Sequence, residues 1–328
     1  MREEESSWPA AGQVMVQTVV SAISAGTELL IYRGQIPAGI CKDEPIQALA
    51  SDERFPIKYG YAAVGRVVTV GEGVDKQWQG KMVFAFHPHT SLFLSSPAEL
   101  IPIPPDLLPE EALLLSNLET SVNFLMDGQP MIGEQVVVFG QGVVGLLTTA
   151  LLALMPLNGL VTLDNHLLRR EKSLALGAHA SLDPQASDAI EQLDLLLQTE
   201  RDYKGADLTY ELSGNPGAVE KAIQITGFNG RVVIGSLYGQ KQLSLNMDGH
   251  FHRSRIRLIS SQVSTIAPEW TGRWTKARRL RFALQMLRRI KPAHLITHRF
   301  PLAQASQAYV LLDQRPQEAI QVILTYEG

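Results

Sequence analysis

The chain has 328 residues, 45% of them apolar, so it can bury a sizeable core and is long enough for two domains. A formal net charge of −4 argues against general binding to nucleic acid or anionic membranes, and a single cysteine, Cys41, excludes an internal disulfide and a cysteine-based metal cluster. The acidic N-terminus is unlike a signal peptide, and the longest apolar run, about 13 residues, is too short to span a membrane. We therefore expect a cytoplasmic protein.

The first 126 residues are dominated by short runs of β-branched and small residues, broken by glycine and proline, which is typical of a small β-rich barrel. A turn is expected at 24–28, and residues 34–56 are expected to form a surface loop with one short helix. Helices are expected at 107–115 and 119–126. The predicted strands are 14–23, 59–71, 80–86 and 98–102.

The strongest motif begins with a buried strand at 136–139, which is followed directly by a glycine turn and an apolar helix. The turn reads Gly140-Gln141-Gly142-Val143-Val144-Gly145. Its first glycine permits the turn, the second lets a pyrophosphate approach the backbone, and the third lets the helix pack closely on the strand. A second strand ends in Asp164, 19 positions after Gly145, near the spacing of about 20 expected for the acid that binds the adenosine ribose. These features predict a dinucleotide site.

Strands and helices alternate after residue 135, which indicates a parallel sheet covered on both faces. The expected strands include 180–182, 206–212, 230–236 and 256–263, and the expected helices include 169–176, 188–197 and 218–225. A later helix, 274–290, places Ala277, Leu280, Leu284 and Leu287 on one face. The eight Lys and Arg residues between 273 and 291 are interpreted as its solvated face, with an anion site or a subunit contact as alternatives. A helix and a terminal strand, 319–326, close the chain.

Six segments carry a family resemblance that covers nearly the whole chain: 26–34 (GTELLIYRG), 60–71 (GYAAVGRVVTVG), 136–145 (VVVFGQGVVG), 207–214 (DLTYELSG), 230–239 (GRVVIGSLYG) and 300–312 (FPLAQASQAYVLL). In this order they resemble the medium-chain dehydrogenase/reductase superfamily. Residues 87–99, 116–123 and 260–264 are similar to its branch of bacteriochlorophyllide dehydrogenase and zinc-type alcohol dehydrogenase-like proteins. The resemblance implies an α/β fold: a GroES-like β-barrel catalytic domain, 1–126 and 265–328, and a Rossmann domain with a doubly wound parallel sheet, 127–264. It also leads us to expect that a strand pair usual in the family, before Val14, is missing.

The zinc ligands of the superfamily are replaced in this sequence. Where zinc-dependent members have Cys-Gly-Thr-Asp-Leu-His and Gly-His-Glu, this chain has Ala25 for the cysteine, Leu30 for the first histidine, and Tyr61 with Ala62 for the His-Glu pair. A zinc site needs about three protein ligands from Cys, His, Asp and Glu. The four-cysteine structural zinc loop is absent from the sequence as well. We therefore expect a protein without zinc.

The resemblance also suggests catalytic residues. Thr27 matches the hydroxyl that relays the substrate proton, Tyr61 places a phenol at a metal-ligand position, and His89 lies with His87 in a loop expected to overhang the catalytic cleft. The alternatives are that Thr27 caps a turn, that Tyr61 fills the space of the lost metal, and that the histidines are surface residues. Glu28 matches an acid behind the metal site and is interpreted as structural.

Residues outside the glycine turn complete the cofactor site that the resemblance implies. They are Asp164, Asn165, Arg169, Ser213, Gly235, Ser236 and Ser261. The charge of Asp164 favours NAD over NADP, although Arg169 and Arg170 could instead turn toward a 2′-phosphate and so allow NADP.

The resulting hypothesis is a zinc-independent oxidoreductase that transfers a hydride between NAD(H) and a small-molecule alcohol, ketone or activated double bond. The alternative is a non-catalytic nucleotide-binding protein with a structural or redox-sensing role. We expect a homodimer, because the last strand of the nucleotide domain commonly pairs with its symmetry mate in this superfamily. Residues 256–264 would form that contact.

Overall fold

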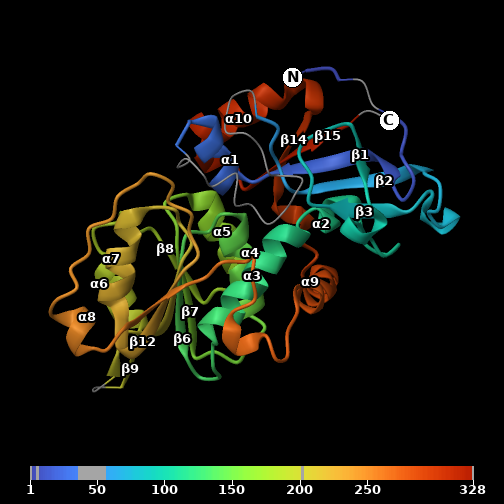
Figure 1. Ribbon diagram of the computed structural model, residues 1–328. Coiled ribbons are helices and arrows are strands. Elements are labelled where there is room, and N and C mark those ends of the chain that lie inside the picture. Colours follow the sequence, from blue (N-terminus) through green and yellow to red (C-terminus); the bar gives the residue numbers. More distant parts are fainter. Residues whose placement is uncertain (1, 5–6, 36–56, 201–202, 327–328) are drawn as a thin grey trace. The chain divides into compact units, whose positions relative to one another are not determined.

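The computed structural model describes residues 2–4, 7–35, 57–200 and 203–326, and the chain forms two compact units (Figure 1). The first unit, which we call the N/C unit, comprises Met1–Ser116 and Leu284–Gly328, and the second, the middle unit, comprises Asn117–Ala283. Both transitions fall inside helices, α3 (Leu115–Gly128) and α9 (Lys276–Ile290). The predicted domain limits at 126 and 265 stay a prediction.

The N/C unit is built on a seven-stranded sheet around the long strand β1 (Val14–Ile23). One edge of β1 pairs with β2 (Ala63–Val70), and the other pairs first with β4 (Leu92–Ser95) and then with β15 (Gln321–Thr325). The terminal strand therefore lies beside the first one. The remaining elements of the unit are α1 (Ala25–Tyr32), β3 (Met82–Ala85), β5 (Ile101–Pro102), α2 (Pro109–Ala112), β14 (Ile296–Pro301) and α10 (Ala305–Gln314).

The middle unit contains a six-stranded, fully parallel sheet in the order β13-β12-β11-β6-β7-β8. Figure 1 shows its helices on both faces. The strands are β6 (Gln135–Phe139), β7 (Gly159–Leu163), β8 (Ala180–Leu182), β11 (Ala206–Glu211), β12 (Thr226–Ile234) and β13 (Arg257–Ser260). The helices besides α3 and α9 are α4 (Val143–Leu152), α5 (Leu167–Ala175), α6 (Ala189–Leu196), α7 (Pro216–Ile225) and α8 (His250–Arg253). Two short strands, β9 (Gln198–Glu200) and β10 (Tyr203–Lys204), pair antiparallel.

Alternation along β6 explains why this sheet needs two helical layers. Val137 and Phe139 pack into one apolar cluster with α6 and α7, whereas Val136 and Val138 pack into another with α3 and α4. All four side chains are at most 3% exposed. A strand that is apolar on both faces is stable only when both faces are covered. The predicted α/β architecture with a doubly wound parallel sheet is confirmed.

Some expectations for local structure are wrong. The expected turn at 24–28 is the first turn of α1, because the Glu28 side chain accepts a hydrogen bond from the Ser24 backbone N–H at 2.6 Å and the Glu28 N–H donates to the Ser24 carbonyl at 2.8 Å. The expected strand 98–102 retains only β5, since a 3-10 turn precedes it. Strands β4 and β14 were not predicted. The expected helix within 34–56 and Cys41 lie outside the described residues.

Candidate functional site

The glycine turn between β6 and α4 is shaped by close backbone contacts. Gly140 has φ +87°, and a Cβ there would lie 2.5 Å from Cα of Ser213; a Cβ on Gly145 would lie 1.9 Å from the Gly140 carbonyl oxygen. At Gly142, in contrast, a Cβ would meet nothing within 4 Å, and no side chain caps the N-terminus of α4. Two glycines are therefore required by packing, while the middle one faces open space at a helix N-terminus. Such a terminus favours an anion, and the turn fits a dinucleotide pyrophosphate.

Asp164 lies beside this turn, just after β7. Its Oδ2 accepts a hydrogen bond from the Gln141 backbone N–H at 2.7 Å, and its Oδ1 accepts one from the His166 N–H at 2.9 Å. The side chain of Gln141 is buried and bonds to Gly140 and Thr149, so this residue contributes its backbone to the turn. The carboxylate and the glycine turn are thus brought together, as the sequence predicts.

The basic residues after Asp164 differ in their contacts. Arg170 donates to the Asp164 carbonyl at 2.8 Å and to Asp183 at 3.1 Å, so its guanidinium is held by acidic and carbonyl oxygens. Arg169 Nη1 lies 3.9 Å from Asp164 Oδ2. The Arg169 guanidinium is therefore a positive charge next to Asp164, the residue expected to bind the ribose. Burial lowers the pKa of Arg169, and Asp164 opposes this. Asn165 is exposed.

The predicted cofactor residues after β11 and β12 form a second group at the carboxyl edge of the sheet. The Ser213 hydroxyl donates to the buried carboxylate of Glu211, and the Ser236 hydroxyl accepts from the Gly214 N–H at 2.9 Å. A Cβ on Gly235 would lie 2.4 Å from the Phe124 ring, so packing requires glycine there. These residues share one edge with the glycine turn.

Ser261 and Arg279 belong to a buried polar cluster of the middle unit. The Ser261 hydroxyl donates to Asp127, whose pKa is raised by burial. Arg279 has no exposed surface: it donates to Glu119 at 3.0 Å, to Asn123, and to the carbonyls of Thr265 (3.1 Å) and Val263. The interpretation of the basic residues of α9 as one solvated face is wrong for Arg279. The helix is also rotated from the expected face, since Ala277 is exposed and Ala283 is buried.

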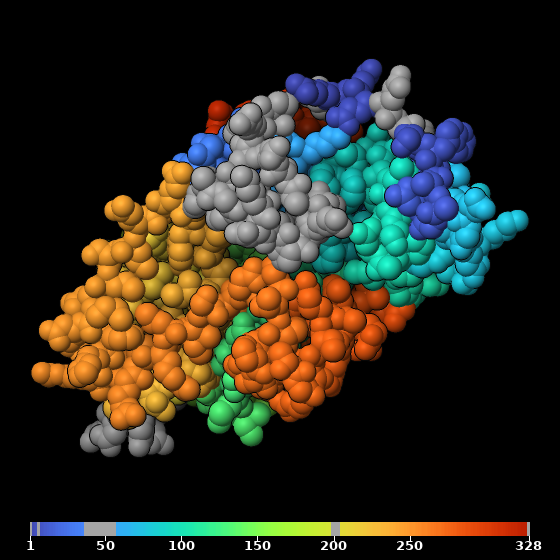
Figure 2. Space-filling view, viewed as in Figure 1, coloured from blue at the N-terminus to red at the C-terminus, as the bar shows by residue number. Residues whose placement is uncertain are grey.

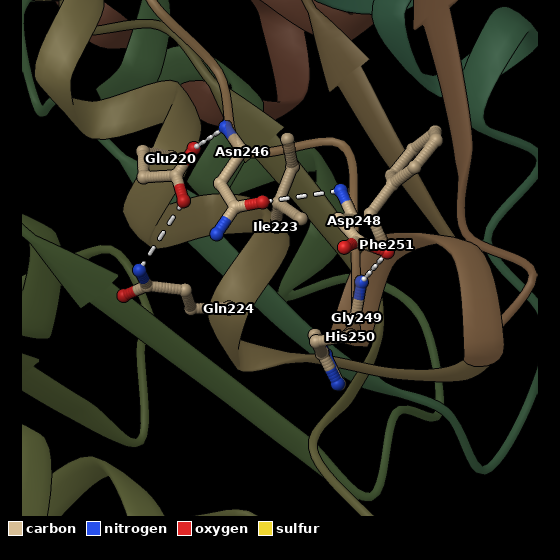
Figure 3. A pocket seen from close by; sticks show the side chains of 8 residues that line it. All are labelled: Glu220, Ile223, Gln224, Asn246, Asp248, Gly249, His250 and Phe251. Carbon is tan, nitrogen blue, oxygen red and sulfur yellow. Dashed lines mark hydrogen bonds between the residues drawn. The ribbon is translucent and has the colours of Figure 1, made fainter.

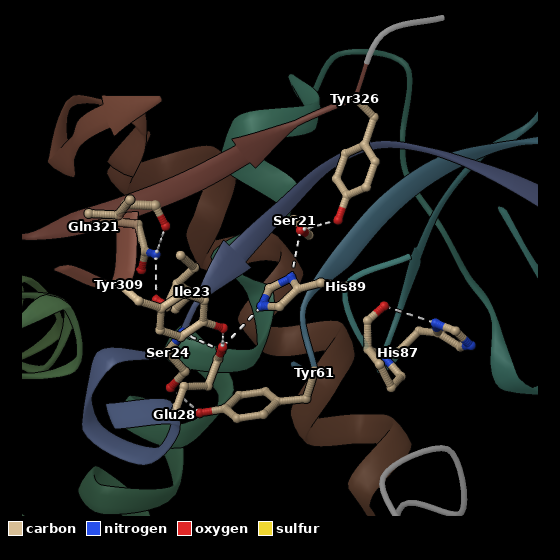
Figure 4. Close-up of polar contacts among 12 residues, drawn as sticks. Ser21, Ile23, Ser24, Glu28, Tyr61, His87, His89, Tyr309, Gln321 and Tyr326 are labelled. Atoms are coloured by element: carbon tan, nitrogen blue, oxygen red, sulfur yellow. Dashed lines mark hydrogen bonds and ion pairs between the residues drawn. The ribbon is translucent and has the colours of Figure 1, made fainter. Parts of the chain in front are cut away.

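The N/C unit contains a buried network centred on Glu28 (Figure 4). Its Oε2 lies 3.0 Å from Nε2 of His89 and accepts from the Tyr309 hydroxyl, and the carboxylate is 2% exposed. Burial alone would raise the pKa of Glu28, but the charge of His89 and hydrogen bonds from His89, Tyr309 and the Ser24 N–H lower it below its usual range. Nδ1 of His89 lies 2.7 Å from the Ser21 hydroxyl. Both ring nitrogens of His89 therefore face protein partners.

Tyr61 and Thr27 lie at the edge of this network. The Tyr61 hydroxyl forms a hydrogen bond with the Ser24 hydroxyl (Figure 4), next to the N–H that binds Glu28. Thr27 is half-buried in the first turn of α1, and its N–H donates to the Ser24 carbonyl at 3.1 Å. His89 packs against Gly60, where a Cβ would lie 2.8 Å from the ring. The structure thus gathers Tyr61, His89 and α1 in one unit.

Metal-binding geometry is not found among the residues that the structure describes. No group of three or more His, Cys, Asp and Glu side chains there is placed to hold a metal ion. His87, the neighbour of His89, stacks on Phe93 at 4.0 Å between ring centroids, and burial lowers its pKa. The described residues therefore do not fit a zinc site.

Sequence reasoning missed four contributors to the sites: Ser21, Tyr309 and Tyr326 around His89, and Glu211 beneath Ser213. Tyr309 and Tyr326 are separated from Glu28 by almost the whole chain, so spacing gives no signal for them. Glu211 ends the strand ADLTYE, which also contains Asp207 and Thr209, so the sequence gives no clear signal for it either.

A separate open cavity of about 280 Å³ lies between α7 and α8 in the middle unit (Figure 3). Polar groups in its lining bond to one another and to the backbone: Glu220 accepts from the Asn246 N–H, and Asp248 from the Gly249 N–H. We do not count it as a functional site.

No helix in the described part of the chain is long and apolar enough to cross a membrane.

Comparisons with known proteins agree with this architecture. Residues 143–280 match the family model "Zinc-binding dehydrogenase". The chain is 27% identical over 264 residues to (R,R)-butanediol dehydrogenase of Bacillus subtilis, covering 72% of this chain and 73% of that protein. It is 25% identical over 336 residues to 2-desacetyl-2-hydroxyethyl bacteriochlorophyllide A dehydrogenase of Cereibacter sphaeroides, covering 98% and 92%.

A solved structure extends the similarity to the whole fold. It is described as a short chain alcohol dehydrogenase (rspB) from Escherichia coli CFT073 complexed with NADH, and it superposes with a TM-score of 0.78 at 18% identity, covering 98% of this chain and 94% of that one. The glycine turn, the parallel sheet and the sequence relatives together support the resemblance of the chain to the alcohol dehydrogenase-like oxidoreductases of the medium-chain dehydrogenase/reductase superfamily.

Proposed function

We propose that this protein is a zinc-independent oxidoreductase that uses NAD(H) to interconvert a small-molecule alcohol and ketone, or to reduce an activated double bond. The observation that carries the proposal is the pairing of an open Gly142 at the N-terminus of α4 with the Asp164 carboxylate bonded to the same turn. This pair supplies an anion site and a ribose acceptor next to each other. The NADH in the related rspB structure supports the same cofactor class.

The bound nicotinamide would supply or accept the hydride. In the direction of carbonyl reduction, the carbonyl carbon gains the hydride and its oxygen gains a proton, so the protein must stabilise negative charge on that oxygen and provide the proton. We assign these tasks to hydroxyl groups, because the zinc-ligand positions hold Ala25, Leu30, Tyr61 and Ala62. Tyr61 is the proposed donor, with Ser24 as its hydrogen-bond partner. Thr27 is proposed to assist it.

We give His89 a positioning role within this proposal. Direct donation by His89 would require it to break its contact with Glu28 or with Ser21, at 3.0 and 2.7 Å. Held by both, the ring fixes Glu28, and Glu28 in turn fixes the Ser24 N–H beside Tyr61. The two contacts of His89, with Glu28 and with Ser21, also favour the alternative of a non-catalytic nucleotide-binding protein. A histidine whose two ring nitrogens are both held by protein groups transfers no proton to a substrate.

Turnover decides between the two functions. The purified protein should bind NADH and oxidise it in the presence of at least one member of a panel of ketones, quinones and enones. Tyr61→Phe should lower kcat by about 100-fold while NADH binding is retained, because general acid catalysis contributes about that factor. Tight NADH binding without turnover on any panel member would favour the non-catalytic alternative.

We further propose a homodimer. Within the described residues β13 and β8 are the two edge strands of the parallel sheet, and β13 pairs with β12 on one side. An edge strand without proline or a bulge is open to pairing with another chain, and a two-fold contact closes it. The segment Arg257–Ser260 contains no proline, which supports this contact.

A further inference from the structure

The inference concerns the buried carboxylate at the carboxyl edge of the nucleotide-binding sheet. Glu211 is the last residue of β11 and lies in register with Phe139 of β6 and Ile234 of β12, the last residues of those strands. Its side chain has no exposed surface. Ligands of open parallel sheets bind outside this carboxyl edge. A buried charged group there needs partners, because an unpaired buried charge is costly.

Glu211 has three donors, and they come from two loops. Oε1 accepts from the Ser213 N–H at 2.8 Å and from the Ser213 hydroxyl, and Oε2 accepts from the Tyr238 hydroxyl. Burial and the neighbouring Glu211 raise the pKa of Tyr238, so its hydroxyl keeps its proton and acts as a donor. One carboxylate therefore joins the loop after β11 to the loop after β12.

The position of Ser213 matters for the glycine turn. A Cβ on Gly140 would lie 2.5 Å from Ser213 Cα and 2.6 Å from its nitrogen, so the two backbones are already in close contact. The Leu212 N–H also donates to the Phe139 carbonyl at 2.8 Å. The backbone at Ser213 is therefore held against the turn by packing, and the Glu211 side chain orders the loop that follows Ser213.

The loop after β12 is also anchored by the packing of Tyr238 and Leu245 on the core, by the Asn246 N–H bond to Glu220, and by contacts with Gly214. Ser236 accepts from the Gly214 N–H at 2.9 Å, and Lys241 donates to the Gly214 carbonyl at 2.7 Å. Beyond these, much of residues 237–249 is exposed, and Figure 2 shows the orange residues near 250 on the molecular surface. The Tyr238 hydroxyl is thus an anchor that reaches from this loop to the end of β11.

We propose that Glu211 and Tyr238 are positioning residues for the nicotinamide half of the dinucleotide. Asp164 follows β7, on one side of β6, whereas Glu211 ends β11 and Tyr238 follows β12 on its other side. A dinucleotide with its adenosine ribose at Asp164 and its pyrophosphate at Gly142 extends toward the loops that Glu211 and Tyr238 hold. This inference rests on the proposed use of NAD(H).

The test compares the binding of NADH and of AMP, which lacks the nicotinamide half, by fluorescence and calorimetric titration. Tyr238→Phe removes only the hydroxyl, and Glu211→Gln replaces the charged acceptor. Each variant should weaken NADH binding by about tenfold, because the loss of one hydrogen bond has an effect of about this size on a binding constant. AMP binding should change by less than about twofold, because distant sites are nearly independent. Glu211→Asp should restore part of the NADH affinity.

Glu134→Gln is the matched control. Glu134 precedes β6 at the opposite, amino edge of the same sheet and pairs with Arg231 at 2.6 Å. Its replacement should lower thermal stability and leave NADH binding unchanged. Equal weakening of NADH and AMP by Tyr238→Phe, or unchanged NADH binding in that variant, would overturn the positioning role alone. Failure of the unmodified protein to bind NADH would overturn the proposed function and this inference together. If Glu211→Gln does not fold, Tyr238→Phe still decides.

Discussion

Nε2 of His89 lies 3.0 Å from Oε2 of Glu28, and the two side chains are 10% and 2% exposed. This contact joins the first turn of α1 to the segment between β3 and β4, and Tyr309 from α10 completes it. The N/C unit thus contains a buried acid and base that bond to each other. Removal of one member of such a pair leaves the other buried without its partner.

Glu28→Gln should lower the free energy of unfolding by about 3 kcal/mol at neutral pH, for this reason. Because the pKa of Glu28 is lowered in the folded protein, its stabilisation is fully present above the unfolded value, about 4.3, and is lost as the pH falls through the folded value. Urea unfolding across acidic pH should therefore show a weaker pH dependence in the variant. Glu110→Gln, which breaks the half-exposed pair with Arg299, should cost less than about 1 kcal/mol. Equal losses in both variants would contradict the special role of Glu28.

The purified protein should contain no stoichiometric zinc. Ala25, Leu30, Tyr61 and Ala62 stand at the ligand positions of zinc-dependent relatives and supply none of the usual ligands. Elemental analysis should give far less than one zinc per chain, and a chelator should leave both the melting temperature and the activity unchanged. One tightly bound zinc per chain, lost together with activity on chelation, would refute this prediction.

The protein should bind NAD(H) more tightly than NADP(H), because the Asp164 carboxylate repels a 2′-phosphate. Asp164→Ala should reduce the preference by about tenfold or more. Asp164→Asn is the more conservative variant, since it removes the charge and keeps one oxygen, which can accept from one of the two N–H donors, Gln141 or His166, that bond to separate oxygens of Asp164. Titration of each variant with both cofactors measures the effect. Tighter binding of NADP(H) by the unmodified protein would assign the cofactor choice to Arg169 instead.

Arg279→Met should destabilise the protein by about 3 kcal/mol, because Glu119 then remains buried without its cation. The substitution also removes the donors for the carbonyls of Val263 and Thr265. Arg281→Met, an exposed position on the same helix, should change stability by less than about 0.5 kcal/mol. Thermal and urea unfolding of both variants measure the difference, and similar losses would show that the burial of Arg279 contributes nothing.

Light scattering at micromolar concentration should give about twice the chain mass of 36.1 kDa. Ile259→Pro should shift the protein toward the monomer, because proline removes a backbone donor from β13. Asp164→Ala should leave the mass unchanged, since Asp164 follows β7, on the other side of the sheet from β13. A mass near that of one chain for the unmodified protein would argue directly against the dimer.

The sequence predicted the middle unit well because its signals are local. The strand at 136–139, the three glycines of the turn and Asp164 follow one another within about thirty residues, as the dinucleotide motif requires. The structure explains two of those glycines by contacts under 3 Å and leaves the third open. The helical start of α1 was missed, because a Ser24 backbone bond to a side chain four residues later is not visible as periodicity.

The sequence by itself determined the class of fold, the place of the glycine turn and the residue types that stand at the superfamily's zinc-ligand positions, because each of these depends on residue types at fixed spacing along the chain. Only the tertiary structure decided which polar side chains meet. Tyr326 reaches Ser21 because β15 pairs with β1, Tyr309 reaches Glu28 from α10, and Arg279 reaches Glu119 from 160 positions away. Hydrogen bonds between residues so distant in sequence follow from strand register and helix rotation, and residue spacing contains neither.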